Sequence, residues 1–347
     1  MLAAVYHNPN DLRVELVPVP EISDDEVLIK VKAASICGTD LRILHGNHRM
    51  YPSGTIRIPG HEIVGTIAKM GKRVQGVNDD QTYFIAPNIG CGHCRQCVSG
   101  NNNLCSNFEA LGITMDGGFA EYVRIPAPAI RQGNLIPISK DIDAAAAALI
   151  EPLACVLRSH DLLKIHPGDI VLVMGAGPIG VLHIKMARLS GASCVIVSDP
   201  NEERLKTAVQ MGADFGINPQ KEDLTTVLSE KTSGHGIDVI IVAAPAHVAQ
   251  ESALELAAIK GRICFFGGLP KDRPAINFNS NLVHYKELMV TATTGSSTEN
   301  CWRASQIVNS RSIDLSSLIS LRIPLNKAIE AFHTAENGKV LKVVLEP

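Results

Sequence analysis

Aromatic residues are scarce in this chain: they make up 4% of the 347 residues and include a single tryptophan. No apolar run approaches the ~20 residues that a membrane-spanning helix needs, and the run over 144–150 has the length of a buried helix segment. Basic residues number 32 but form no cluster, and the net charge is −3, so the electrostatic footprint of a nucleic-acid-binding protein is missing. We therefore expect no membrane contact and no nucleic-acid partner.

A signal peptide and a disulfide framework are missing as well. The first residues lack the basic region and the long apolar stretch of a secretory signal. The nine cysteines are odd in number, and Cys155, Cys194 and Cys264 lie in apolar surroundings, which is typical of reduced thiols. We expect a soluble, cytoplasmic protein. The length predicts two domains, and a content of 46% hydrophobic and 19% charged residues is typical of a globular enzyme.

The pattern of predicted strands and helices changes near residue 142. Before it, short β-like segments alternate with proline and glycine, which predicts an irregular all-β or barrel-like domain. After it, strands alternate with helices, and this α/β pattern predicts a parallel sheet covered on both faces. We expect these strands at 171–174, 194–198, 237–243, 263–266 and 288–293, and the helices at 178–190, 201–211 and 247–259. A tail with helices near 301–310 and 325–336 and a strand over 340–345 is expected to return to the first domain.

Four cysteines with the spacing C-x2-C-x2-C-x7-C favour a closed metal site. The predicted ligands are Cys91, Cys94, Cys97 and Cys105. Zn²⁺ prefers such a tetrahedral set of four thiolates, and a site with no open position stabilises a loop instead of doing chemistry. A disulfide cluster would need an oxidising compartment. An iron–sulfur site would have a shorter last gap and a following proline, where this chain has Ser106.

A glycine-rich loop directly follows the predicted strand 171–174 and opens the next helix. Its predicted cofactor-binding residues are Gly175, Gly177, Pro178, Ile179 and Gly180. The first glycine permits a tight turn, the second allows a pyrophosphate to approach the backbone, and the third allows close helix–strand packing. A glycine-rich turn without a ligand is the alternative, but the flanking strand and helix fit the dinucleotide fingerprint.

Asp199 ends the second predicted strand, nineteen residues after Gly180. A carboxylate there accepts hydrogen bonds from the adenosine ribose and repels a 2′-phosphate, so NAD is favoured over NADP. Arg204, one turn into the next helix, is interpreted as a surface or adenine-stacking residue and not as a phosphate clamp.

Three further segments carry a family resemblance: Cys37-Gly-Thr39-Asp, Gly-His61-Glu62 and Glu151-Pro-Leu-Ala. Each alone is a weak signal. Together with the cysteine set and the glycine loop, they make the chain similar to the zinc-dependent medium-chain dehydrogenases, and within that family to the sorbitol (polyol) dehydrogenase branch. L-threonine dehydrogenase is a near relative of that branch.

The resemblance implies a GroES-like catalytic domain over 1–151 and 295–347, and a Rossmann NAD-binding domain over 152–294. It implies two zinc ions per chain and a homo-oligomer, either dimer or tetramer. It also implies that Cys37 and His61 bind a catalytic zinc. The third protein ligand is Glu62 or Glu151, the latter at a position that is cysteine in the alcohol dehydrogenase branch.

Thr39 matches the family position whose hydroxyl takes the proton of the substrate alcohol. Some alcohol dehydrogenases have a histidine three positions further on, which completes the proton relay. This chain has Arg42 there, and a guanidinium cannot act as a base. Water, His45 or His48 could complete the route, although a plain surface role is the better interpretation of either histidine.

The resemblance implies oxidation of a secondary alcohol of a polyol to a ketone. An L-threonine or amino-alcohol dehydrogenase is the alternative, and a polyol-phosphate dehydrogenase stays open because Arg42, Arg49 and Arg57 flank the zinc motifs. The small polar segment 294–300 suits a hydroxyl-rich substrate but lacks the arginine and aromatic residue that are usual in polyol dehydrogenases. A non-catalytic NAD-binding sensor would have no reason to keep the residues of an open metal site.

Overall fold

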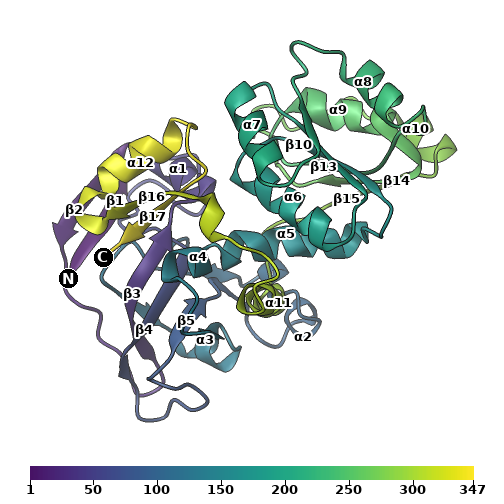
Figure 1. The fold of residues 1–347 in the computed structure, drawn as a ribbon. Coiled ribbons are helices and arrows are strands. Elements are labelled where there is room, and N and C mark those ends of the chain that lie inside the picture. Colours follow the sequence, from purple (N-terminus) through teal and green to yellow (C-terminus); the bar gives the residue numbers. More distant parts are fainter. The chain divides into compact units, whose positions relative to one another are not determined.

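The computed structural model describes residues 1–347 and divides into two units. The first unit comprises Met1–Ala154 and Gly295–Pro347, and the second comprises Cys155–Thr294. Figure 1 shows that both chain termini belong to the first unit, where the yellow C-terminal segment lies beside the purple N-terminal one. The helix α5 (Ile150–Leu163) carries the chain from one unit into the other.

The second unit contains a six-stranded sheet in which every pair of neighbours is parallel. The strand order is β12-β11-β10-β13-β14-β15. This order reverses between β10 and β13, and ligands of doubly wound sheets bind at such a switch point. The strands are β10 (Ile170–Met174), β11 (Cys194–Ser198), β12 (Phe215–Ile217), β13 (Ile237–Val242), β14 (Ala257–Phe265) and β15 (Met289–Ala292).

Both faces of this sheet are buried by helices. In β10, Val171 and Val173 join one apolar cluster while Leu172 and Met174 join the other, because successive side chains point to opposite faces. Residues of α6 and α7 complete the first cluster, and residues of α8 and α9 complete the second. The helices are α6 (Pro178–Leu189), α7 (Glu202–Gln210), α8 (Leu224–Lys231), α9 (His247–Leu256) and α10 (Ser280–Tyr285).

One expected helix is too long. The sequence predicts a helix over 247–259, but α9 ends at Leu256 and β14 begins at Ala257. Ala257 pairs with Ile237 of β13, so sheet pairing overrides the helix propensity of the Leu-Ala-Ala segment. The short strand β12 and the helices α8 and α10 have no counterpart in the sequence-based expectation.

The first unit is built on a seven-stranded sheet. Its main order is β16-β17-β3-β4-β5-β9, with β8 also paired to β3. The tail strand β17 pairs antiparallel with β3, so the C-terminal segment is part of the first unit's sheet. The strands are β3 (Val27–Ser35), β4 (Glu62–Met70), β5 (Thr82–Ile85), β8 (Tyr122–Ile125), β9 (Leu135–Ile138), β16 (Ile319–Pro324) and β17 (Lys342–Glu346).

Shorter elements surround this sheet. Two strand pairs are β1 (Leu2–Asn8) with β2 (Asp11–Leu16), and β6 (Asn88–Ile89) with β7 (Glu109–Ala110). The α-helices are α1 (Gly38–Leu44), α2 (Arg95–Val98), α3 (Ala127–Arg131), α4 (Ala144–Ala148), α11 (Thr298–Asn309) and α12 (Ala328–Glu336). The 3-10 turns are η1 (Asn102–Leu104), η2 (Ser316–Leu318) and η3 (Leu325–Lys327). None of the helices has both the length and the apolar character that crossing a membrane requires.

Candidate active site and metal centres

The four cysteines of the C-x2-C-x2-C-x7-C segment converge in the first unit. Their sulfur atoms all lie within 4.8 Å of one another, and none forms a disulfide. Three of the sulfur–sulfur distances are 3.5 Å for Cys94–Cys97, 3.7 Å for Cys94–Cys105 and 4.0 Å for Cys91–Cys97. Tetrahedral zinc with Zn–S bonds of about 2.3 Å separates its sulfurs by about 3.8 Å, so the set fits zinc.

Backbone N–H groups assist these thiols. The amide of Cys94 donates to Sγ of Cys91, and the amide of Cys91 donates to Sγ of Cys105, each at 3.4 Å. Backbone donation from His93 and Cys94 lowers the pKa of Cys91 from its usual value. Because thiolate is the form that binds a metal, these donors favour ligation by Cys91, whereas burial raises the pKa of the neighbouring Cys97 thiol to about 12.

A second cluster contains Cys37, His61 and Glu62, whose ligand atoms also lie within 4.8 Å of one another. Strands β3 and β4 bring them together, because Ser35 pairs with Glu62 and Cys37 follows two residues later as the N-cap of α1. His61 directly precedes β4. One thiol, one imidazole and one carboxylate are three zinc ligands that leave a position open, the pattern of a catalytic site.

Asp40 orients this cluster. Its side chain is fully buried, and its Oδ2 accepts the amide hydrogen of Cys37 at 2.8 Å while Oδ1 accepts that of Gly60 at 3.3 Å. The same Oδ1 lies 3.5 Å from Nδ1 of His61, a buried nitrogen with no hydrogen bond. A carboxylate behind one imidazole nitrogen leaves the other nitrogen to face a metal, as in carboxylate–histidine–zinc triads.

Lys342 of β17 also belongs to this cluster. Its Nζ donates to both carboxylate oxygens of Glu62, at 2.8 and 2.7 Å, and to the carbonyl of Ile36 at 3.0 Å. The side chain is buried, which disfavours the ammonium form, but the charges of Glu62, Cys37 and Asp40 raise its pKa above the usual value. Glu62 therefore has a permanent cationic partner next to the metal position.

Glu151, the other predicted ligand, is buried near the start of α5. Its carboxylate is not among the atoms that the structure gathers with Cys37 and His61. It lies close enough to Cys301 of α11 to help raise the pKa of that thiol, after the larger effect of burial. The structure thus gathers Glu62, and not Glu151, with Cys37 and His61.

Thr39 and Arg42 are connected directly. Nη2 of Arg42 donates to Oγ1 of Thr39 at 3.0 Å. His45 is unavailable for a proton relay, because its nitrogens bond to Asn10 at 2.8 Å and to Glu336 at 2.5 Å. His48 accepts the amide hydrogen of Met50 at Nδ1. In its neutral form, Nε2 of His48 then carries the hydrogen and is a donor.

The segment 294–300 was expected to suit a hydroxyl-rich substrate, but its hydroxyls are used internally. The Ser297 hydroxyl caps α11, and the backbone and hydroxyl of Thr298 bond to Asn102 at 2.9 and 3.0 Å. Asn102 lies between Cys97 and Cys105 and also donates to the carbonyl of Asn88. This buried network ties the four-cysteine loop to the start of α11.

The glycine loop of the second unit has the form a dinucleotide requires. Gly175 directly follows β10 with a φ of +114°, and α6 begins at Pro178 with Gly177 as its N-cap. A Cβ on Gly180 would lie 1.8 Å from the carbonyl oxygen of Gly175, so only glycine fits there. A Cβ on Gly177 would meet nothing within 4 Å, which leaves open space where a pyrophosphate approaches a helix N-terminus.

Asp199 follows β11 and closes this loop. Its Oδ2 accepts the amide hydrogen of Ala176, and its Oδ1 accepts that of Asn201, both at 2.8 Å. A carboxylate has about four acceptor positions, so lone pairs remain for ribose hydroxyls. Arg204 lies in the first turn of α7, which Asn201 caps.

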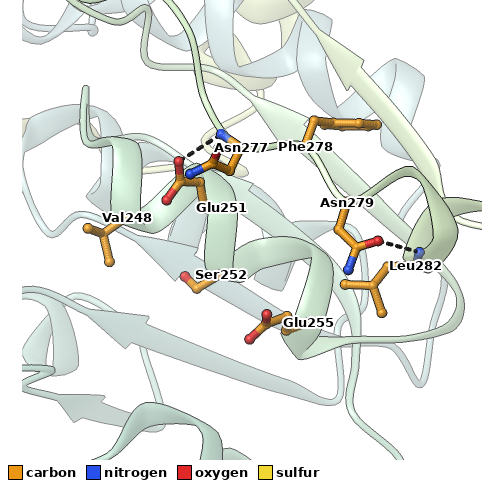
Figure 2. A pocket seen from close by; sticks show the side chains of 8 residues that line it. All are labelled: Val248, Glu251, Ser252, Glu255, Asn277, Phe278, Asn279 and Leu282. Atoms are coloured by element: carbon orange, nitrogen blue, oxygen red, sulfur yellow. Dashed lines mark hydrogen bonds between the residues drawn. The ribbon is translucent and has the colours of Figure 1, made fainter.

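A depression of ≈510 Å³ on α9 and α10 contains none of the predicted site residues. Figure 2 shows Glu251 bonded to the backbone of Asn277, and Asn279 bonded to the backbone of Leu282. Val248 and Phe278 provide exposed apolar surface, and no basic group lines the depression. It has no features of a phosphate or metal site.

Comparison with known proteins identifies the family. The alcohol dehydrogenase GroES-like domain matches residues 23–136, and the zinc-binding dehydrogenase domain matches residues 178–310. The chain belongs to the zinc-dependent medium-chain dehydrogenases. The predicted α/β fold, with a GroES-like domain and a Rossmann-like parallel sheet, is confirmed.

Individual relatives cover nearly the whole chain. L-threonine 3-dehydrogenase of Bacillus subtilis is 36% identical over 95% of this chain and 94% of its own length. Sorbitol dehydrogenase of Halalkalibacterium halodurans is 31% identical over 100% and 98%. A zinc-binding dehydrogenase of Sinorhizobium meliloti 1021 bound to NADP matches with a TM-score of 0.91 and 32% identity, over 100% and 99%. The chain is thus a zinc-type oxidoreductase that uses a nicotinamide cofactor.

Two site residues, Asp40 and Lys342, were not predicted from the sequence. A signal for Lys342 exists, since it is the one charged residue in the otherwise apolar stretch 340–345. Asp40 lies within the Cys37 motif, but a carboxylate two residues from Gly38 is also an ordinary helix-cap residue.

Proposed function

We propose that this protein is a zinc- and NAD-dependent dehydrogenase that oxidises a secondary alcohol of a polyol-like substrate to a ketone. The observation that carries the proposal is the convergence of the ligand atoms of Cys37, His61 and Glu62, with Thr39 two residues after Cys37 in the chain. A zinc ion held there supplies Lewis-acid activation of the substrate hydroxyl, and NAD is the hydride acceptor.

The protein's own residues then have distinct tasks. Asp40 orients His61, and Lys342 balances the charge of Glu62. The Thr39 hydroxyl accepts the proton that leaves the alcohol and passes it to solvent, with Arg42 as its neighbour. In the second unit, the amides of the glycine loop bind the pyrophosphate, and Asp199 binds the adenosine ribose.

Glu151 is proposed to approach the metal when substrate enters and to exchange with Glu62, because catalytic zinc tolerates a change from four to five ligands. Glu62→Ala and Glu151→Ala should each reduce activity, and at least one should lose the catalytic zinc. Full activity and full zinc content in Glu151→Ala would mean that Glu62 alone is the glutamate ligand of the catalytic zinc.

L-threonine or another amino alcohol is the second candidate substrate. The 36% identity to the Bacillus subtilis L-threonine 3-dehydrogenase favours it. We also propose a homo-oligomer, dimer or tetramer, which sedimentation analysis of the purified protein would measure.

The experiment is a panel of polyols, polyol phosphates and L-threonine, assayed by NADH absorbance with metal analysis of the same preparation. We expect two zinc ions per chain and turnover of at least one class. Bound NAD and both zinc ions without turnover of any secondary alcohol would instead support a non-catalytic sensor.

A further inference from the structure

Two arginines near the Cys37 cluster have no carboxylate partner. Arg42 is exposed on α1, and the only hydrogen bond of its guanidinium goes to the Thr39 hydroxyl. Arg49 is exposed as well and forms no ion pair. Arg57 differs, because its guanidinium bonds to the carbonyls of Met50 and Ile113 and is therefore occupied. Arg42 and Arg49 thus keep N–H donors available for a ligand.

His48 lies beside both arginines. Burial, together with smaller effects of the positive charges of Arg42, His61 and Arg49, lowers the pKa of His48 to about 4, against an opposite effect of Asp40. The imidazole is therefore neutral at ordinary pH, and its Nδ1 accepts the amide hydrogen of Met50. Its remaining nitrogen is a donor. The rim of the metal position thus carries two cations and a neutral N–H donor.

The buried cluster behind this rim does not balance those cations. Cys37 as thiolate, Asp40 and Glu62 bring three negative charges, and Lys342 brings one positive charge. A zinc ion with two positive charges makes this group neutral. Arg42 and Arg49 then remain exposed positive charges without an acidic partner, and such a positive field concentrates anionic ligands.

We propose that Arg42 determines specificity by binding an oxyanion of the substrate, so that the enzyme prefers a secondary alcohol carrying a carboxylate or phosphate over its neutral analogue. This inference rests on the proposed dehydrogenase function. Guanidinium binds both oxyanions through charge-assisted, often bidentate hydrogen bonds. The oxyanion is unchanged in the reaction: the carbinol carbon gives its hydride to NAD, and the hydroxyl gives its proton through Thr39 to solvent.

Two substrate pairs distinguish a carboxylate from a phosphate as the oxyanion that Arg42 binds. L-threonine is compared with L-threoninamide, and galactitol 1-phosphate with galactitol. We expect one member that carries a carboxylate or phosphate to exceed its partner without that oxyanion in kcat/KM by at least about tenfold, with a KM that rises as salt screens the charge. Arg42→Gln should lower kcat/KM for that substrate by about 10- to 100-fold, mainly through KM. The partner without the oxyanion should lose less, namely only what the contact between Arg42 and the Thr39 hydroxyl contributes.

The controls test whether charge at this position is what matters. Arg42→Lys should keep part of the kcat/KM that Arg42→Gln loses. Lys69→Gln removes one positive charge from an exposed position of β4 and should leave kcat/KM unchanged. Calorimetry gives a readout independent of turnover: the Kd of the preferred anion for the enzyme–NADH complex should rise in Arg42→Gln by the same factor as KM.

Four results would overturn the inference. Equal kcat/KM for the two members of each pair would show that the enzyme has no preference for the oxyanion. Equal losses of kcat/KM for both members in Arg42→Gln would mean that Arg42 acts only through the Thr39 hydroxyl. A higher Kd for NAD with an unchanged Kd for the anion would mean that Arg42 binds the cofactor. Failure of every compound to react would refute the dehydrogenase proposal, and unchanged binding of both anions by Arg42→Gln would refute the inference separately.

Discussion

Lys342 donates to both carboxylate oxygens of Glu62, at 2.8 and 2.7 Å, and the two side chains are buried. The partners are 280 residues apart in the chain and meet because β17 and β4 both pair with β3. The ammonium compensates a carboxylate that would otherwise be costly to bury. The tail strand therefore contributes to the metal site as well as to the sheet.

Lys342→Met should destabilise the protein by about 3–5 kcal/mol, because it leaves a buried carboxylate without its partner. The double variant with Glu62→Gln should recover part of this loss without recovering activity. Chemical unfolding of both variants measures the effect. Lys327→Met, which removes an exposed lysine from the same tail, is the control. A single variant as stable as the unmodified protein would show that the ion pair is dispensable.

Thr39→Val keeps the side-chain shape and removes the hydroxyl that Arg42 contacts. We expect kcat to fall on the order of 10²-fold with zinc content intact, the usual scale for losing an acid–base group. Steady-state kinetics and metal analysis of the same sample test this. Normal turnover would mean that the proton leaves by another route.

Motifs with short spacing were predictable from the sequence. The set from Cys91 to Cys105 and the loop from Gly175 to Gly180 depend on local chain geometry, so their spacing contains most of the information. Lys342 was not predictable as a partner of Glu62, because nothing local in the sequence specifies that β17 pairs with β3. The boundary at Ala257 was missed for a similar reason, since pairing with β13 decides it.

The proton route was also beyond the sequence. His45 was a candidate relay, but Glu336, 291 residues away, engages its Nε2. Which nitrogen of His48 is the donor could be assigned only from the position of the Met50 amide, which donates to Nδ1. Such assignments depend on which polar atoms are already occupied, and only a folded arrangement supplies that information.

Cys94→Ser should lower stability, since a structural zinc contributes folding free energy directly. The loss should extend to α11, because Asn102 connects the cysteine loop to Thr298. We expect one zinc ion fewer per chain and a lower Tm. Unchanged zinc content and Tm together with lost turnover would make the four-cysteine site catalytic.

NAD should be preferred over NADP by a few kcal/mol, because the Asp199 carboxylate repels a 2′-phosphate. Asp199→Gly should weaken NAD use and narrow the gap, and it also removes the bond to Ala176 of the glycine loop. The measurement is kcat/KM for both cofactors. Equal values of kcat/KM for NAD and NADP in the unmodified enzyme would contradict the prediction. The test matters because the Sinorhizobium meliloti relative is bound to NADP.

The second unit contains a buried imidazole pair, His160 of α5 and His183 of α6. Nε2 of His160 lies 3.2 Å from Nδ1 of His183, while the other two ring nitrogens have no partner. Burial lowers the pKa of His160 to about 4, against a smaller opposite effect of Asp161. Burial and His160 lower the pKa of His183 as well, and the ring of Phe266 packs against it.

Both imidazoles are therefore neutral in the folded protein, whereas unfolded histidine takes up a proton below about pH 6.5. As the pH falls from 6.5 towards 4, the unfolded state binds more protons than the folded state, so the free energy of unfolding decreases. For His160 alone, the decrease between about pH 7.5 and about pH 5 is about 2 kcal/mol.

The double variant His160→Leu with His183→Leu should lose less stability over this interval by at least that amount. Chemical unfolding at the two pH values measures the difference, which also cancels any effect of zinc loss common to both proteins. His235→Gln, an exposed histidine of the same unit, should leave the pH dependence unchanged. If the double variant lost as much stability as the unmodified protein, the pair would have to be protonated or hydrated within the fold.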